Sequence, residues 1–110
     1  MLENTSKLRT IDYALYEQVV NMIGGKWKMR IFYVLAMNHV LRYGEIKKLL
    51  IPITHKMLST QLKEMEKDGL ILRKEYPQIP PKVEYSLSQK AIDLRPMFES
   101  MCDWIHKYLK

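Results

Sequence analysis

The segment 43–69 reads YGEIKKLLIPITHKMLSTQLKEMEKDG, and it decides the fold. A short helix is predicted over 44–50, because its apolar residues fall on one side. Pro52 breaks that helix, since proline disfavours helical backbone in the residue before it. Thr54 is a good N-cap for a second helix over 55–68, which Gly69 ends. Two short helices joined by a few residues are typical of a helix-turn-helix motif.

The second predicted helix, residues 55–68, separates apolar from cationic side chains. At about 100° per residue, one side of this helix carries the apolar residues Leu58, Leu62 and Met65. The opposite side carries Lys56, Thr60, Lys63 and Lys67, with Ser59 at its edge. The major groove of DNA admits one α-helix, and its phosphates attract lysine, so this face predicts contact with duplex DNA. An ordinary solvated helix surface is the alternative.

Candidate DNA contacts follow from this placement. Residues near the start of such a helix lie deepest in the groove. The contacts predicted from the motif are Thr54, His55, Lys56, Ser59, Thr60 and Lys63. The phosphate contacts predicted around it are Lys26, Lys28, Arg42 and Lys82, with a weaker case for Arg73 and Lys74. His55 falls beside the apolar side of its helix, so local packing is the alternative to DNA contact for this residue. For each of the lysines and arginines, the alternative is an ordinary solvated surface position.

A hairpin is predicted directly after the motif, over about 70–87. LILRKEY at 70–76 and VEYSL at 83–87 alternate loosely like strands. The intervening PQIPPK, residues 77–82, contains three prolines and no glycine, which predicts a stiff, extended tip. A hairpin in this position is called a wing. The expected fold class is therefore mainly α with a small β-hairpin, a winged helix-turn-helix.

Three further helices are expected outside the motif and the wing. The segment 27–37 is apolar on nearly all sides, so it predicts a central, buried helix. Amphipathic helices are predicted over about 11–23 and 89–109, the first ended by Gly24-Gly25 and the second bent by Pro96. One small domain has difficulty covering two such apolar faces, so they predict a homodimer. The dimerisation residues expected are Leu15, Val19, Phe98, Met101, Ile105 and Tyr108.

The composition fits a single domain over 1–110 with a polyanionic partner. The net charge is +6, and residues 26–90 hold the whole excess, with thirteen basic and six acidic residues.

No apolar run approaches the roughly 20 residues that span a bilayer, and the first twenty residues do not resemble a secretory signal, so we expect a cytoplasmic protein without a membrane partner. With one cysteine and three scattered histidines, no disulfide within the chain, metal site or cofactor is expected.

The lone cysteine, Cys102, has two interpretations. It is a small buried apolar residue at the dimer seam, or it serves as an intersubunit disulfide or an oxidant switch. Five aromatic residues also have two interpretations: they line an effector pocket between the central and terminal helices, or they belong to the hydrophobic core. These residues are Trp27, Phe32, Tyr33, Trp104 and Tyr108.

Several motifs, taken in order, resemble the HxlR family of winged-helix regulators, which are MarR-like. They are GGKWK at 24–28, LRYGEI at 41–46, THKMLS at 54–59, LKEMEKDGL at 62–70, YP…PPKVEYSL at 76–87 and LRP at 94–96. The resemblance implies a dimer paired by its first and last helices, with DNA read by the helix at 55–68 and a wing at 77–82. Some members sense oxidants through a cysteine near the N-terminus, but this sequence has none before Cys102.

The expected function is that of a sequence-specific, double-stranded DNA-binding transcription regulator. We expect a repressor that binds a near-palindromic operator as a homodimer, with an unidentified small molecule as a possible effector. A winged-helix module that binds a protein or RNA is the alternative. No glycine-rich phosphate loop or nucleophile motif is present, so no enzyme activity is expected.

Overall fold

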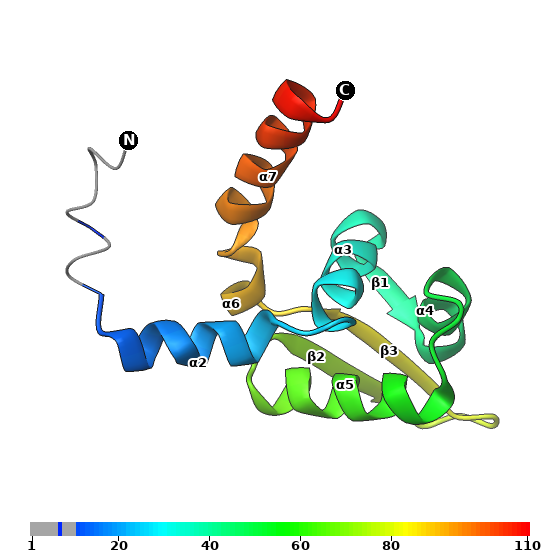
Figure 1. The fold of residues 1–110 in the computed structure, drawn as a ribbon. Helices are drawn as coiled ribbons and strands as arrows, with labels where there is room; N and C mark the ends of the chain where they lie inside the picture. The colour runs from blue at the N-terminus through cyan, green and yellow to red at the C-terminus, as the bar shows by residue number, and fades with distance from the viewer. Residues whose placement is uncertain (1–6, 8–10) are drawn as a thin grey trace.

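The computed structural model describes Lys7 and residues 11–110. The domain predicted over 1–110 therefore includes residues 1–6 and 8–10, which lie outside the described part of the chain. Helices and a small sheet follow one another along the chain (Figure 1). The elements are α2 (Tyr13–Ile23), α3 (Lys28–Asn38), β1 (Val40–Arg42), α4 (Tyr43–Leu49), α5 (His55–Lys67), β2 (Ile71–Tyr76), β3 (Lys82–Leu87), α6 (Gln89–Ile92) and α7 (Arg95–Tyr108).

The helix-turn-helix consists of α4 and α5, and local sequence fixes the start and the end of α5. Thr54 caps α5, since its hydroxyl accepts a hydrogen bond from the backbone N–H of Met57 at 3.1 Å. Beyond its last turn, Gly69 adopts a φ of 74°, a left-handed conformation that glycine takes without steric cost. The backbone N–H of Leu70 then donates to the carbonyl of Met65 at 2.9 Å, which closes the helix end.

The sheet has three antiparallel strands in the order β1-β3-β2, one more than the predicted hairpin. The additional strand, Val40–Arg42, pairs with β3. Leu41 lies opposite Tyr85 and is buried, so this strand joins the helix-turn-helix to the wing through both hydrogen bonds and core packing. The predicted winged helix-turn-helix is thus confirmed, with an additional strand.

The core lies between α3, α4, α5 and the sheet. Its most deeply buried side chains are Ile31, Leu35, Ile46, Leu58, Met65, Leu70 and Ile71. The apolar side predicted for the second helix is confirmed, because Leu58, Leu62 and Met65 are at most 3% exposed. That anchoring decides which side of α5 faces outward.

The C-terminal helical region differs from the prediction of one bent helix over 89–109. Ser88 caps the short α6, its hydroxyl accepting from the N–H of Ala91 at 3.2 Å and donating to the carbonyl of Gly69 at 2.5 Å. The chain then interrupts the helix at Asp93 and restarts it as α7, with Pro96 in the first turn. The structure thus has a break where a bend was predicted, and Pro96 removes no intrahelical hydrogen bond because it lies in the first turn.

Both α2 and α7 extend away from the compact part of the molecule (Figure 1). Neither of these helices contains a buried residue. Among the residues that the structure describes, no helix is long and apolar enough to cross a membrane.

Candidate nucleic-acid interface

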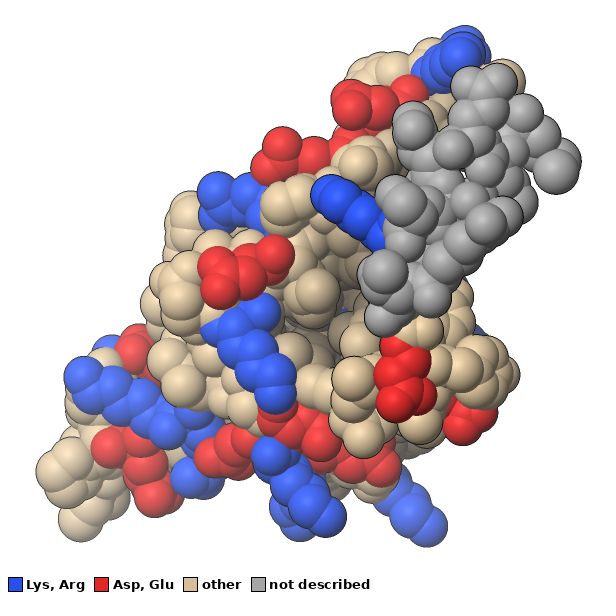
Figure 2. Space-filling view, turned by 90° about the vertical axis from the view of Figure 1, so that its left-hand side faces the viewer, with Lys and Arg blue, Asp and Glu red and all other residues tan. Residues whose placement is uncertain are grey.

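The outward side of α5 is lined by exposed cations and hydroxyls. Lys and Arg side chains project from the lower edge of the molecule, the edge along which α5 runs, with acidic side chains between them (Figures 1 and 2). Lys56, Thr60, Lys63 and Lys67 are all exposed and come from this helix. Because the opposite side of α5 is anchored in the core, these four side chains lie on the surface of a fixed rod.

A hydrogen-bonded cluster of Tyr43, His55 and Ser59 joins α4 to the first turns of α5. The Tyr43 hydroxyl lies 2.7 Å from Nδ1 of His55, 3.2 Å from Oγ of Ser59, and donates to the backbone carbonyl of His55 at 3.0 Å. The two rings also meet edge to face, with centroids 5.1 Å apart. His55 therefore packs locally, as the alternative interpretation allowed, yet it stays exposed at the start of the helix. Tyr43 was missing from the predicted site, because no sequence pattern shows which side chain its hydroxyl meets.

Lys28 is the clearest departure from the predicted set of phosphate contacts. Its side chain is only 10% exposed, and its ammonium lies 3.1 Å from Oε2 of Glu64. The same ammonium donates to the backbone carbonyl of Asn21 at 3.1 Å. An ammonium held in this way joins α2 and α5 from inside the molecule, so we withdraw Lys28 from the candidate contacts. Its position at the start of a helix resembled a phosphate site, but the helix is turned inward there.

Two other flanking cations remain at the surface. Lys26 is exposed beside α3, with its ammonium 5.0 Å from the centre of the Trp27 ring. Arg42 is exposed just before α4, and its backbone N–H donates to Oε1 of Glu45 at 2.8 Å. Both side chains are exposed beside the motif, where they can reach a polyanion.

The base of the wing is a cluster around Tyr76 rather than a row of free cations. The ammonium groups of Lys74 and Lys82 lie 4.9 and 4.8 Å from the centre of the Tyr76 ring. Lys82 also pairs with Glu84 at 3.4 Å. The hydrogen bond from the Tyr76 hydroxyl, at 2.7 Å, and the nearby Lys82 hold the pKa of the Glu84 carboxyl below its ordinary value. The tip of the wing carries Ile79, which is fully exposed.

A cleft between α5 and the wing brings together residues that the sequence left apart. It has a volume of about 320 Å³, and its lining includes Tyr43, Ser59, Lys63 and Arg73. A side-chain hydrogen bond with Tyr85 raises the pKa of Arg73. The weaker candidate Arg73 therefore lies in the same cleft as the stronger candidates Ser59 and Lys63. Lys74 faces the other way, over Tyr76.

The predicted dimerisation residues fall into two groups. Exposed apolar side chains on α2 and α7 are Leu15, Val19, Met101, Ile105 and Tyr108. Phe98 differs, because its half-buried ring stacks on Phe32 of the same chain, with centroids 4.3 Å apart; its role as a dimer contact stays a prediction.

The two questions left open by the sequence are partly answered. Cys102 is exposed in the single chain, so both a place at the dimer seam and a role in oxidation stay predictions. Of the five aromatic residues considered for a pocket, Trp27 and Phe32 belong to the core, whereas the other three are exposed. Phe32 and Tyr33 also line a pocket beside α7.

Comparison with known proteins decides the family. Residues 22–110 match the family model described as HxlR-like helix-turn-helix. The chain belongs to the HxlR-like helix-turn-helix family. The family resemblance inferred from the motifs is thereby confirmed, and this HxlR-family protein is a DNA-binding transcriptional regulator rather than an enzyme.

Two bacterial relatives cover most of the chain. An HTH-type transcriptional regulator of Halalkalibacterium halodurans is 50% identical over 104 residues, which is 94% of this chain and 92% of the relative. The HTH-type transcriptional regulator YdzF of Bacillus subtilis is 53% identical over 91 residues, 83% of this chain and 84% of the relative.

Solved structures agree with the sequence comparison. The structure of the HTH-type transcriptional regulator YtcD shares 41% identity, with a TM-score of 0.80, over 86% of this chain and 96% of that one. The redox regulator HypR in its oxidised form shares 39% identity, with a TM-score of 0.76, over 84% of this chain and 95% of that one.

Proposed function

We propose that this HxlR-family protein is a repressor that binds a near-palindromic operator as a homodimer, in the cytoplasm where the chromosome lies. The observation that carries the proposal is the outward face of α5, where Lys56, Thr60 and Lys63 are exposed opposite a fully buried apolar side. Lysine and hydroxyl side chains on one helix face reach both phosphates and base edges in the major groove. The proposed contacts are Lys26, Arg42, Thr54, His55, Lys56, Ser59, Thr60, Lys63 and Arg73, with Lys82 at the base of the wing.

The dimer rests on the apolar side chains that α2 and α7 expose. Leu15 and Val19 on α2 are 57% and 43% exposed, and Met101 on α7 is 45% exposed. A second copy would cover these faces symmetrically. Its α5 would then lie about 34 Å from the first, one turn of DNA, which is why a near-palindrome is the expected operator. Bound across a promoter, such a dimer would obstruct RNA polymerase.

DNA selected from random duplexes provides the test, with fluorescence anisotropy as the readout. For a dimer that contacts several phosphates, affinity should fall about a thousandfold or more between 50 and 200 mM salt. Lys63→Ala removes one proposed contact per subunit and should reduce the slope of log affinity against log salt by about 0.9 for each lost contact. Lys107→Ala on α7 is the matched control and should leave the slope unchanged.

The alternative partners give different outcomes in the same experiment. If Lys63→Ala and Lys56→Ala bind duplex DNA as tightly as the parent, α5 is not the DNA-reading surface, and a protein partner is favoured. If single-stranded RNA binds more tightly than the selected duplex, the operator model fails. In vitro transcription from a template with the selected site separates repression from activation.

A further inference from the structure

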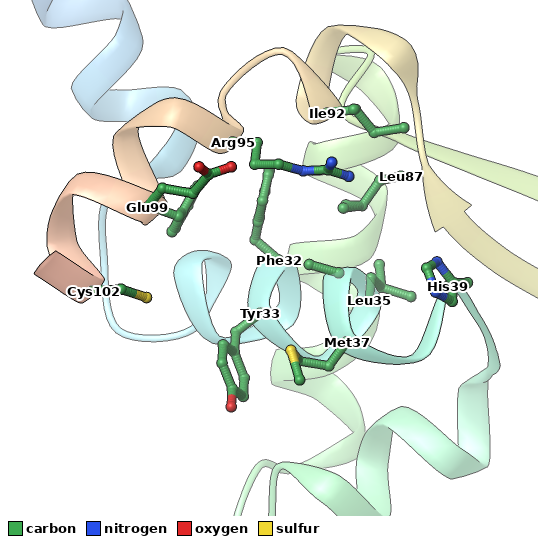
Figure 3. Close-up of a pocket in the computed structure, with 12 residues that line it drawn as sticks. Phe32, Tyr33, Leu35, Met37, His39, Leu87, Ile92, Arg95, Glu99 and Cys102 are labelled. Atoms are coloured by element: carbon green, nitrogen blue, oxygen red, sulfur yellow. The ribbon is translucent and has the colours of Figure 1, made fainter.

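A pocket of about 230 Å³ lies between α3, α7 and the end of β3, on a different part of the molecule from α5 (Figure 3). One wall comes from α3 and includes Phe32, Leu35 and Met37. The facing wall comes from Ile92 and from α7. Leu87, at the end of β3, lies between them (Figure 3).

The interior of this pocket is apolar. Phe32 and Leu35 are 5% and 1% exposed and belong to the core. The ring of Phe98 stacks on Phe32 with an interplanar angle of 17°, which fixes a flat aromatic surface in the pocket. A 150 Å³ apolar cavity accommodates benzene, so this pocket has room for one aromatic ring with a short substituent. Such a lining favours an apolar ligand body.

Cationic and polar groups stand at the rim of the pocket. Arg95 lines it, and within the described part of the chain this guanidinium has no hydrogen bond or ion pair with another side chain. His39 also lines it and adopts a φ of 66°, an uncommon conformation for a residue other than glycine. Such strained positions occur frequently at ligand sites. Glu99 contributes the one carboxylate of the lining, one helical turn from Arg95.

We propose that this pocket binds a small aromatic carboxylate, with its ring against Phe32 and Phe98 and its carboxylate at Arg95. An unpaired guanidinium beside an apolar surface matches a carboxylate, because it offers two parallel N–H donors. The proposal identifies a chemical class for the effector and rests on the proposed function only for its regulatory consequence.

The effect on DNA binding follows from the two elements that form the walls of the pocket. Arg95 lies on α7, one of the two helices of the proposed dimer contact, whereas Phe32 and Leu35 lie on α3 in the body of the winged helix. A ligand held between them favours one position of α7 relative to the body. Since that position sets the separation of the two α5 helices in a dimer, ligand binding changes the affinity for DNA.

Three matched probes test the ligand class by isothermal titration calorimetry of the full chain without DNA. They are 3-phenylpropanoate, its neutral analogue 3-phenylpropan-1-ol, and phenylalanine, which adds an ammonium group. The carboxylate should bind about tenfold more tightly than the alcohol, a difference that one charge-assisted hydrogen bond at a partly exposed site supplies. Tighter binding of phenylalanine would show that Glu99 receives the ammonium and would overturn the anion class. No saturable binding of any probe at millimolar concentration, as when a partner subunit fills the pocket, would overturn the site.

Variants locate the binding. Arg95→Gln should reduce binding of 3-phenylpropanoate to the level of the alcohol and leave the alcohol unaffected, whereas Lys107→Gln, also on α7 but outside the pocket, should change neither. Amide NMR shifts should concentrate at Leu87 and Ile92, and shifts confined to α2 would overturn the assignment. Addition of 3-phenylpropanoate should change operator affinity severalfold, and binding without such a change would refute the regulatory part. Since the titrations contain no DNA, their failure leaves the proposed DNA binding intact.

Discussion

A single hydroxyl, that of Tyr43, organises the start of the helix proposed to read DNA. If its one proton goes to the carbonyl of His55, Nδ1 of His55 supplies the hydrogen for the 2.7 Å contact between them, which is the tautomer we propose. Nε2 of the neutral ring is then an acceptor. An acceptor on this exposed side chain suits the exocyclic amino group of cytosine or adenine in the major groove. Through this contact, Tyr43 acts as a positioning residue for His55 and, at 3.2 Å, for Ser59.

Tyr43→Phe removes this hydroxyl and keeps the ring. We expect operator affinity to fall about three- to tenfold and the free energy of unfolding to fall by no more than about 1 kcal/mol, because water can replace the lost bonds at this exposed site. Nitrogen-15 NMR of His55 should show hydrogen on Nδ1 in the parent and a shift toward the Nε2–H form in the variant. Tyr33→Phe, on the exposed side of α3, is the control. An unchanged tautomer and an unchanged affinity in Tyr43→Phe would contradict the positioning role.

At the scale of elements, the sequence predicted what depends on local patterns. The spacing of Leu58, Leu62 and Met65 determined the orientation of α5, and Thr54 marked its start, because helix periodicity and capping act within a few residues. The strand β1 was not foreseen, since three residues carry no period and their pairing partner lies more than forty residues away in β3. Such local patterns do not predict contacts between residues that are far apart in the sequence.

Lys28 illustrates this limit within the candidate site. Its charge and its place at the start of α3 suggested a phosphate contact, and only the packing of α2 and α5 against that turn shows the ammonium to be enclosed. The contact with Glu64 therefore joins elements rather than binding DNA. This role leads to an asymmetric prediction for the two partners.

Glu64→Gln leaves a buried ammonium without its counter-charge and should lower the free energy of unfolding by about 1–2 kcal/mol, less than for a fully buried pair because Glu64 is 51% exposed. Lys28→Met replaces the ammonium by an apolar chain of similar length and should change stability by less than about 1 kcal/mol. Urea denaturation of both variants and of the double variant measures whether Glu64→Gln lowers the free energy of unfolding more than Lys28→Met. Lys28→Met should also keep the salt dependence of DNA binding, and a slope reduced by about 0.9 for each lost contact would restore Lys28 as a phosphate contact.

At the scale of the whole molecule, the single chain is more extended than its length requires. Its radius of gyration is 16.2 Å, whereas a compact domain of this length has about 13 Å. The excess reflects α2 and α7, which project from the body without a buried residue (Figure 1). The proposed dimer accounts for this shape, because a second copy would cover the apolar faces of both helices.

The dimer can be tested by placing a charge on one of these faces. Ile105→Asp on α7 should weaken self-association at least about thirtyfold, since an interface carboxylate loses its water without gaining a partner. The fold should survive, because this side chain is 37% exposed in the single chain. Sedimentation equilibrium measures the association, and circular dichroism confirms the helix content.

The control and the DNA readout decide between a dimer of this kind and a regulator that works as a single chain. Ile79→Asp makes the same substitution at the tip of the wing, away from α2 and α7, and should leave the dimer intact.

On a selected operator, the parent should protect two half-sites one DNA turn apart, because each α5 enters one major groove on the same side of the duplex. Ile105→Asp should protect each half-site independently and at least tenfold more weakly, since the second contact no longer benefits from the first. Full protection of both half-sites by a monomeric Ile105→Asp would show that α7 does not pair the subunits, and the spacing argument would then fail with it.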